Sequence, residues 1–293
     1  MPMNEYRLRV GNAVIALFFR NERESRAIGN YFNRASSEAE PDICLSLSFL
    51  NTRSRNADVP NSLFLTKTGD GNGFSTAGGL IQGRYSPASG EGELVVQRLI
   101  TRGSYSRVYE QIFYQAYWSA VRRKGANSFL LHSSGIIRKG QGFAFTGKSG
   151  SGKSTVASLC VDDLVLNDEI TVIDLAGDPA GTCSHHGIVP VIRDTPFNGY
   201  FMDKQEGSAP LAGIMLLNQA PHHRITPTTT INDVKTLTRE IIPPMGLETP
   251  LTPAVYMDMI DCAERTRAAV SLYTMEFLPD SGFGERLDEL GKG

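Results

Sequence analysis

The stretch Phe143-Ala-Phe-Thr-Gly-Lys-Ser-Gly-Ser-Gly-Lys-Ser154 decides the fold of this chain. Its first four residues are typical of a short buried strand. From Gly147 to Ser154 the chain then meets the whole pattern G-x-x-x-x-G-K-[ST] of a phosphate-binding loop. The segment from Ser154 to Cys160 predicts a helix directly after the loop. Because the motif stands between a strand and a helix, we interpret it as a phosphate loop.

The residue types in the loop fit the chemistry of phosphate binding. Gly147, Gly150 and Gly152 can adopt backbone angles that other residues avoid, so successive N–H groups can converge on phosphate oxygens. Lys153 can reach the β and γ phosphates of a nucleotide, and the Ser154 hydroxyl can ligate Mg²⁺. The sequence therefore predicts binding of ATP, or a similar phosphate donor, together with Mg²⁺.

The residues before and after the loop add two further signals. Two apolar runs, 128–137 and 143–146, flank a glycine-containing turn and predict an antiparallel hairpin that leads into the loop. After the loop, the apolar run Leu164–Ile170 closes on Asp168 and Glu169. A Mg²⁺-nucleotide site needs carboxylate ligands, and these usually stand at the end of a neighbouring strand. We therefore expect this acidic pair to lie beside the loop.

In this order, the motifs resemble those of HPr kinase/phosphorylase and its relatives, which are related in fold to phosphoenolpyruvate carboxykinase. The resemblance is carried by Leu131-His132, a glycine turn, the loop Gly147–Ser154, the pair Asp168-Glu169, and the run Asp194-Thr-Pro-Phe-Asn-Gly199. It is clearest from Ser128 to Gly199. It implies an α/β P-loop domain with a mixed sheet.

The resemblance also implies roles for individual residues. Asp168 and Glu169 would act in metal binding and proton removal, with Asp168 favoured as the base, and Lys153 would stabilise developing charge. His132 would orient phosphate or substrate. The implied catalytic residues are Asp168, Glu169, His132 and Lys153, and the implied Mg²⁺ ligands are Ser154, Asp168 and Glu169. The residues implied to hold the donor phosphates are Gly147, Lys148, Ser149, Gly150, Ser151, Gly152, Lys153, Ser154 and Thr155.

This chain departs from the family pattern at two places. The family usually has two aspartates where this chain has Asn167, Asp168 and Glu169, so the pair aligns either with Asp168-Glu169 or with Asn167-Asp168. The first register keeps both carboxylates and the second loses one. Asp194 stands where the family's run begins with glycine.

The rest of the chain predicts two domains, a β-rich α+β domain at 1–125 that ends in a connecting helix, and the P-loop domain at 126–293. Strands in the first domain are predicted at Tyr6–Val10, Val14–Phe19, Cys44–Leu50, Leu63–Thr66 and Leu94–Ile100, with a mixed-charge helix around Arg20–Arg26 and the connecting helix at Tyr105–Lys124. In the second domain we expect strands at Ile214–Leu217 and Val270–Phe277 and helices at Ile231–Ile242 and Pro253–Arg267.

Composition excludes several classes of protein. A net charge of −2 gives no basic footprint for nucleic acid, and no apolar run is long enough to span a membrane. The expected location is therefore the cytoplasm. The four cysteines are widely spaced, which is not typical of a disulfide framework or a four-cysteine zinc site.

A few other residues are weaker candidates for metal or phosphate contact. Cys183 with His185-His186, and His222-His223 with Arg224, lack the spacing that completes zinc coordination. Arg193 and Arg224 are candidates for contact with a transferring phosphate.

The function we expect is an ATP-dependent kinase that transfers a phosphoryl group to a serine or serine-like hydroxyl of an unidentified protein, peptide or small molecule. HPr is not the expected acceptor, because the glycine- and asparagine-rich signature of true HPr kinases is missing. The alternatives are a nucleotide hydrolase or switch with an ordinary P-loop fold, and a non-catalytic nucleotide sensor. A homo-oligomer is compatible with each.

Overall fold

The computed structural model is an α/β structure with mixed sheets, in which strands outnumber helices among the described residues. The described residues are 4–32, 37–49, 65–67, 73–76, 81–86, 89–96, 106–175, 189–197, 199, 204–228, 230–244 and 252–290. The chain forms two compact units, Met1–Gly125 with Pro243–Leu251, and Ala126–Ile242 with Thr252–Gly293.

The first unit is a seven-stranded sheet with two helices. Its strands are β1 (Asn4–Val10), β2 (Ala13–Phe19), β3 (Ile43–Phe49), β4 (Leu65–Lys67), β5 (Gly73–Thr76), β6 (Ile81–Ser86) and β7 (Glu91–Val96), in the order β1-β2-β3-β7-β6-β5-β4. The helices α1 (Glu22–Phe32) and α2 (Ser106–Arg123) meet through an edge-to-face contact of Phe32 with Phe113. The predicted helices are confirmed. Strands β5 and β6 were not predicted, because glycine and polar residues obscure their pattern.

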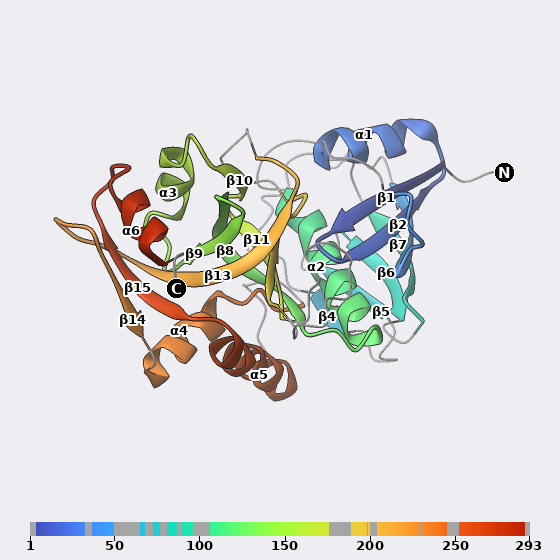
Figure 1. Cartoon of the computed structure of the whole chain (residues 1–293). Helices are drawn as coiled ribbons and strands as arrows, with labels where there is room; N and C mark the ends of the chain where they lie inside the picture. The colour runs from blue at the N-terminus through green and yellow to red at the C-terminus, as the bar shows by residue number, and fades with distance from the viewer. Residues whose placement is uncertain are drawn as a thin grey trace. The chain divides into compact units, whose positions relative to one another are not determined.

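The second unit is built on two long strands, β8 and β13 (Figure 1). Its strands are β8 (Ser128–Arg138), β9 (Gln141–Thr146), β10 (Leu164–Asn167), β11 (Ile170–Asp174), β12 (Val191–Arg193), β13 (Ser208–Gln219), β14 (Arg224–Thr228) and β15 (Leu272–Phe277). The pairings β8–β11, β11–β12, β12–β13, β13–β9 and β9–β8 close a ring. Strands β15 and β14 continue the sheet beyond β13.

The hairpin predicted before the loop is confirmed. Strands β8 and β9 pair antiparallel through a tight turn at Lys139 and Gly140, which both have positive φ, 51° and 80°. Strand β9 then pairs parallel with β13 on its other edge, so the sheet is mixed. The pairing of β8 with β9 places Thr146, the last residue of β9, opposite Ser133 of β8. The predicted phosphate loop leaves the sheet at that point.

Helices cover both faces of this sheet. They are α3 (Lys153–Leu159), α4 (Ile231–Glu240), α5 (Pro253–Ala269) and α6 (Phe283–Leu290). Figure 1 shows α3 and α6 on one face, and α4 and α5 on the other. On the α3 face, Val156 and Phe283 join a buried apolar cluster with strand residues such as Phe145, Met215 and Phe277. Burial of this apolar surface fixes the helix that follows the loop.

In the second unit several boundaries differ from the sequence prediction, and four elements were not predicted. The helix expected at Ile231–Ile242 ends at Glu240, because Ile241 leaves it to bridge Leu131 of β8. Strand β13 extends far beyond the predicted Ile214–Leu217. The short strands β11, β12 and β14 and the helix α6 were missed.

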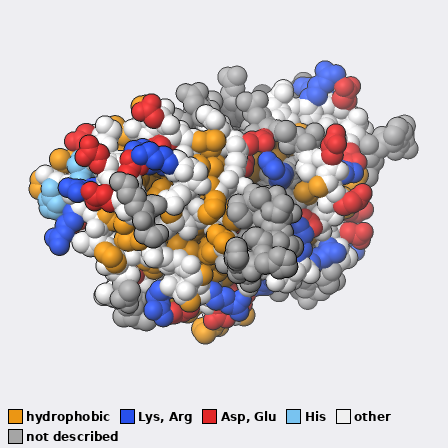
Figure 2. All heavy atoms as spheres, in the orientation of Figure 1, with side chains coloured by type: hydrophobic (Ala, Val, Ile, Leu, Met, Phe, Trp, Pro, Cys, Tyr) orange, Lys and Arg blue, Asp and Glu red, His pale blue; other side chains and the backbone are white. Residues whose placement is uncertain are grey.

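No helix in the described part of the chain is long and apolar enough to cross a bilayer. Over the described part of the face shown in Figure 2, basic and acidic side chains are interspersed and form no basic stripe.

Candidate functional site

The segment from Gly147 to Gly152 forms an open loop whose shape depends on its glycines. Gly147, Gly150 and Gly152 have φ values of 149°, 80° and 106°, a region that favours glycine. Gly152 is also restricted by a close neighbour, since a Cβ there would lie 2.5 Å from Cζ of Phe277. The loop is therefore held between the sheet and the start of α3 in a conformation that these glycines permit.

Lys153 turns back into the loop that precedes it. Its Nζ donates to the carbonyl of Gly147 at 2.8 Å and lies 3.5 Å from the carbonyl of Lys148. The residue is only 7% exposed. Burial lowers the pKa of Lys153, while the carboxylates of Glu240 and Glu169 act in the opposite direction. The loop thus encloses a cation whose present partners are neutral carbonyls.

The acidic pair lies next to this loop. Strands β10 and β11 both pair with β8, and Asp168 and Glu169 form the irregular connection between them. The backbone N–H of Ser133 donates to the carbonyl of Glu169 at 3.1 Å, and Ser133 pairs across β8 and β9 with Thr146. The end of β9 and the acidic pair are thereby fixed on opposite edges of β8, at the same position along it.

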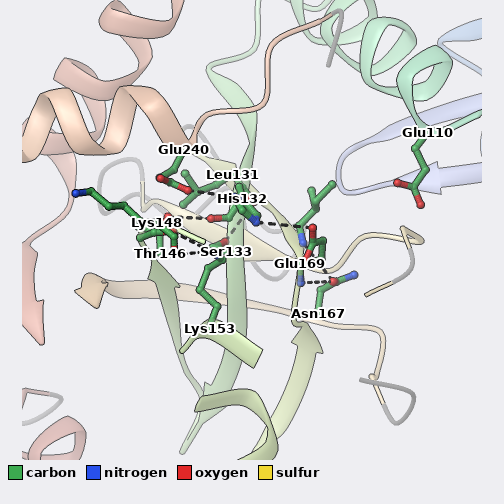
Figure 3. A network of polar contacts seen from close by, with 12 residues as sticks. Glu110, Leu131, His132, Ser133, Thr146, Lys148, Lys153, Asn167, Glu169 and Glu240 are labelled. Carbon is green, nitrogen blue, oxygen red and sulfur yellow. Dashed lines mark hydrogen bonds and ion pairs between the residues drawn. The ribbon is translucent and has the colours of Figure 1, made fainter. Parts of the chain in front are cut away.

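His132 lies between two glutamates, as Figure 3 shows. Its Nδ1 is 3.1 Å from Oε2 of Glu240, and its Nε2 is 3.7 Å from Oε1 of Glu169. The hydroxyl of Thr146 donates to the carbonyl of His132 at 2.8 Å, which ties the histidine backbone to the strand leading into the loop. The predicted residues His132, Lys153 and Glu169 therefore share one site.

Glu240 was missed by sequence reasoning. Its side chain is 11% exposed, and it acts electrostatically on Lys153 more strongly than Glu169 does. The only sequence signal is a glutamate at the end of an amphipathic helix before Ile241-Ile242-Pro243-Pro244, which does not reveal its partner. His132 is 108 residues away.

Asp168 and Glu169 differ in exposure. Asp168 is fully buried, whereas the Glu169 side chain is 26% exposed. Gly199 approaches Asp168 so closely that a Cβ there would lie 1.8 Å from Oδ1. Gly199, which ends the run from Asp194, is therefore required for steric reasons, since a residue without a Cβ lets the chain pass beside the buried carboxylate.

Asn167 has a structural role. Its amide nitrogen lies 2.9 Å from the carbonyl oxygen of Phe197 and 3.1 Å from the hydroxyl of Thr195. Its amide oxygen accepts from the N–H groups of Glu169 and Ile170 at 2.9 and 3.2 Å. The asparagine thus fastens the acidic connection to the Thr195–Phe197 segment.

Replacing Asn167 by aspartate is expected to destabilise the fold by about 2–4 kcal/mol, because a buried carboxylate would face oxygens and lose the amide donor. Urea unfolding of Asn167→Asp measures this. Asn127→Asp is the matched control, since Asn127 is exposed and its Oδ1 accepts from Arg265, a bond that aspartate keeps. If both variants unfold at the parental midpoint, the role given to Asn167 is wrong.

The other candidates lie elsewhere or outside the described residues. Arg193 forms an ion pair with Asp174 at 3.2 Å, and Asp194 accepts from the N–H of Gly207 at 3.1 Å. His222 and His223 pair with Glu276 and Asp280 at 3.3 and 2.7 Å. Arg224 is exposed on β14. Cys183, His185 and His186 fall outside the described part of the chain.

The oxygen donors near the loop fit Mg²⁺ by their chemistry. The carboxylates of Asp168 and Glu169 and the hydroxyl of Ser154 are hard ligands of the kind Mg²⁺ prefers, and Mg²⁺ commonly takes one or two carboxylates plus substrate phosphates and water. Within the described ranges, no group of three or more His, Cys, Asp or Glu side chains could hold a metal ion.

Neither a scan against protein-family models nor a search of curated proteins finds a match to this chain.

Proposed function

We propose that the chain is an ATP-dependent kinase of the HPr-kinase-like type, which transfers a phosphoryl group to a serine or serine-like hydroxyl. The observation that carries the proposal is the buried ammonium of Lys153, which a glycine loop encloses and on which the charges of Glu240 and Glu169 act. These two glutamates are the ones that flank His132. A cation in this position suits the phosphates of a nucleotide, and a carboxylate beside it suits the proton of an attacking hydroxyl.

The second unit is proposed to have the fold of the phosphoenolpyruvate carboxykinase and HPr kinase lineage. The support is the antiparallel hairpin β8–β9, which leads directly into the loop and places β9 in a mixed sheet. An ordinary P-loop fold has a central strand of a parallel sheet there and needs no hairpin. We place the activity in the cytoplasm, where ATP is available as donor.

In the proposed reaction, the acceptor oxygen forms a bond to the γ phosphorus, and the bond from that phosphorus to the β–γ bridging oxygen breaks. ADP leaves with the electron pair. The N–H groups of the segment from Gly147 to Thr155 bind the donor phosphates, and Lys153 exchanges the carbonyl of Gly147 for phosphate oxygens, where its charge stabilises the charge that develops.

The two carboxylates are given different roles because their exposure differs. Glu169 is open to solvent and faces His132, so it can take the proton of an incoming hydroxyl. Asp168, which the sequence favoured as the base, is fully buried and is better placed to act as a fixed negative ligand. Mg²⁺ held by Asp168 and Ser154, with Glu169 nearby, would supply charge neutralisation at the phosphates.

Incubation of the whole chain with γ-labelled ATP, Mg²⁺ and a serine-containing peptide library tests the proposal. We expect ADP formation with label transferred to serine hydroxyls. Release of label only as inorganic phosphate would favour the hydrolase alternative, because water would be the acceptor. Binding of ATP without turnover would favour the non-catalytic sensor, and absence of ATP binding would contradict all three.

A further inference from the structure

Glu240 occupies a position that is unfavourable for a carboxylate. It is the last residue of α4, where the exposed carbonyl groups give the helix end a partial negative charge. It is also largely buried, so water screens its charge poorly. Burial of a carboxylate at this end of a helix costs stability unless a partner compensates, and the partner found there is His132.

The chain holds Glu240 in register with His132 through the residues that follow the helix. Ile241 forms a bridge with Leu131, the residue directly before His132, and the N–H of Ile242 donates to the carbonyl of Leu130 at 2.9 Å. Both isoleucines are buried. The end of α4 is therefore fastened to β8 beside the histidine, and Pro244 after Pro243 prevents the helix from continuing.

The contact with Glu240 fixes which ring nitrogen faces the acidic pair. With Nδ1 directed at Oε2 of Glu240, Nε2 is directed at Oε1 of Glu169. The backbone of His132 is fixed by the hydrogen bond from Thr146. When the backbone and one ring nitrogen of a histidine are held, the direction of the second ring nitrogen is fixed as well.

We propose that Glu240 is a positioning residue of the phosphotransfer site, which holds the His132 ring in place beside the Glu169 carboxylate, the group proposed to take the acceptor proton. This inference rests on the proposed kinase function and adds a residue to it. Glu240 acts on transfer through His132 and touches neither donor nor acceptor. Its charge also acts on Lys153, and the glutamine variant, which loses that charge, separates the two effects. It takes no proton in the reaction, because the proton of the acceptor hydroxyl goes to Glu169.

Two variants of Glu240 separate its hydrogen bond from its charge. Glu240→Ala is expected to lower the turnover of MgATP, measured as phosphate released or transferred, by about 10- to 100-fold, with nucleotide affinity changed by no more than about threefold. Glu240→Gln keeps an oxygen that accepts from Nδ1 and is expected to retain most of the parental turnover. If the glutamine variant is as impaired as the alanine variant, positioning is the wrong role.

Glu276→Ala is the matched control, because it removes another carboxylate that pairs with a histidine, His222, on the surface of the same unit. It is expected to turn over at the parental rate. Equal losses in Glu240→Ala and Glu276→Ala would mean that removing any such pair perturbs the fold, and would overturn the inference.

A double-mutant cycle tests whether Glu240 acts through His132. The double variant Glu240→Ala with His132→Ala is expected to be no slower than His132→Ala alone, since the intermediary is already gone. Multiplicative losses would show an independent role for Glu240 and contradict the inference.

The nitrogen-15 and proton spectrum of the His132 ring gives a readout that needs no turnover. Protection of the Nδ1 proton from solvent exchange is expected in the parent and in Glu240→Gln, and its loss in Glu240→Ala. Parental transfer that persists unchanged in Glu240→Ala overturns this inference alone. A parent that keeps the protected proton but transfers no phosphate overturns the proposed function, and the inference with it.

Discussion

Lys153→Ala is expected to weaken nucleotide binding strongly. The ammonium is buried in the loop and is the cation in best position to meet donor phosphates, so its removal deletes charge-assisted contacts in a poorly solvated site. We expect the dissociation constant for labelled MgATP to rise by about 100-fold or more, which corresponds to about 3 kcal/mol. Equilibrium dialysis of the parent and the variant measures it.

Lys235→Ala is the matched control for this substitution. Lys235 is an exposed lysine on α4, so the control removes one positive charge without touching the loop. It is expected to bind MgATP like the parent. Circular dichroism of both variants checks that the loss of the bond from Lys153 to Gly147 has not unfolded α3. If folded Lys153→Ala binds MgATP as tightly as the parent, the phosphate-loop assignment is wrong.

The second large effect is expected for Glu169→Gln. Glutamine preserves the size of the side chain but cannot accept the acceptor proton, so transfer should fall by about 10²- to 10⁴-fold. Nucleotide binding should persist, because the loop and Lys153 are unchanged. Single-turnover transfer from labelled ATP measures the rate separately from binding.

Asp168→Asn is the informative comparison for Glu169→Gln. Because Asp168 is buried and proposed as a fixed ligand, its substitution is expected to raise the concentration of MgATP needed for half-maximal rate. The opposite pattern, with parental transfer by Glu169→Gln and none by Asp168→Asn at saturating MgATP, would return the role of base to Asp168.

The sequence predicts those parts of the fold that depend on patterns of neighbouring residues. Two apolar runs around Lys139-Gly140 predict the hairpin, and the glycines and Lys153 predict the position of the loop. The strands that were missed are short, and β11 is separated from β10 by only two residues, so one apolar run was predicted where the chain makes two strands. A local pattern does not show that break, because it is created by Asn167 bonding to Thr195 and Phe197.

The candidate site was predictable in part for the same reason. Lys153 and the acidic pair carry a motif, whereas Glu240 reaches the site only because Ile241 and Ile242 fasten the end of α4 to β8. Nothing local distinguishes Glu240 from a solvated glutamate at a helix end. Likewise, the difference between Asp168 and Glu169 lies in their burial, which depends on how closely Gly199 packs against Asp168.

The loop from Gly147 to Ser154 is proposed to hold the phosphates of a nucleotide. A crystal structure of the whole chain with Mg²⁺ and a non-hydrolysable ATP analogue tests it most directly. We predict that the β and γ phosphates lie in the loop and that Nζ of Lys153 leaves the carbonyl of Gly147 to contact them. An analogue bound at another place, with Lys153 still on Gly147, would mean that the loop is not the phosphate site.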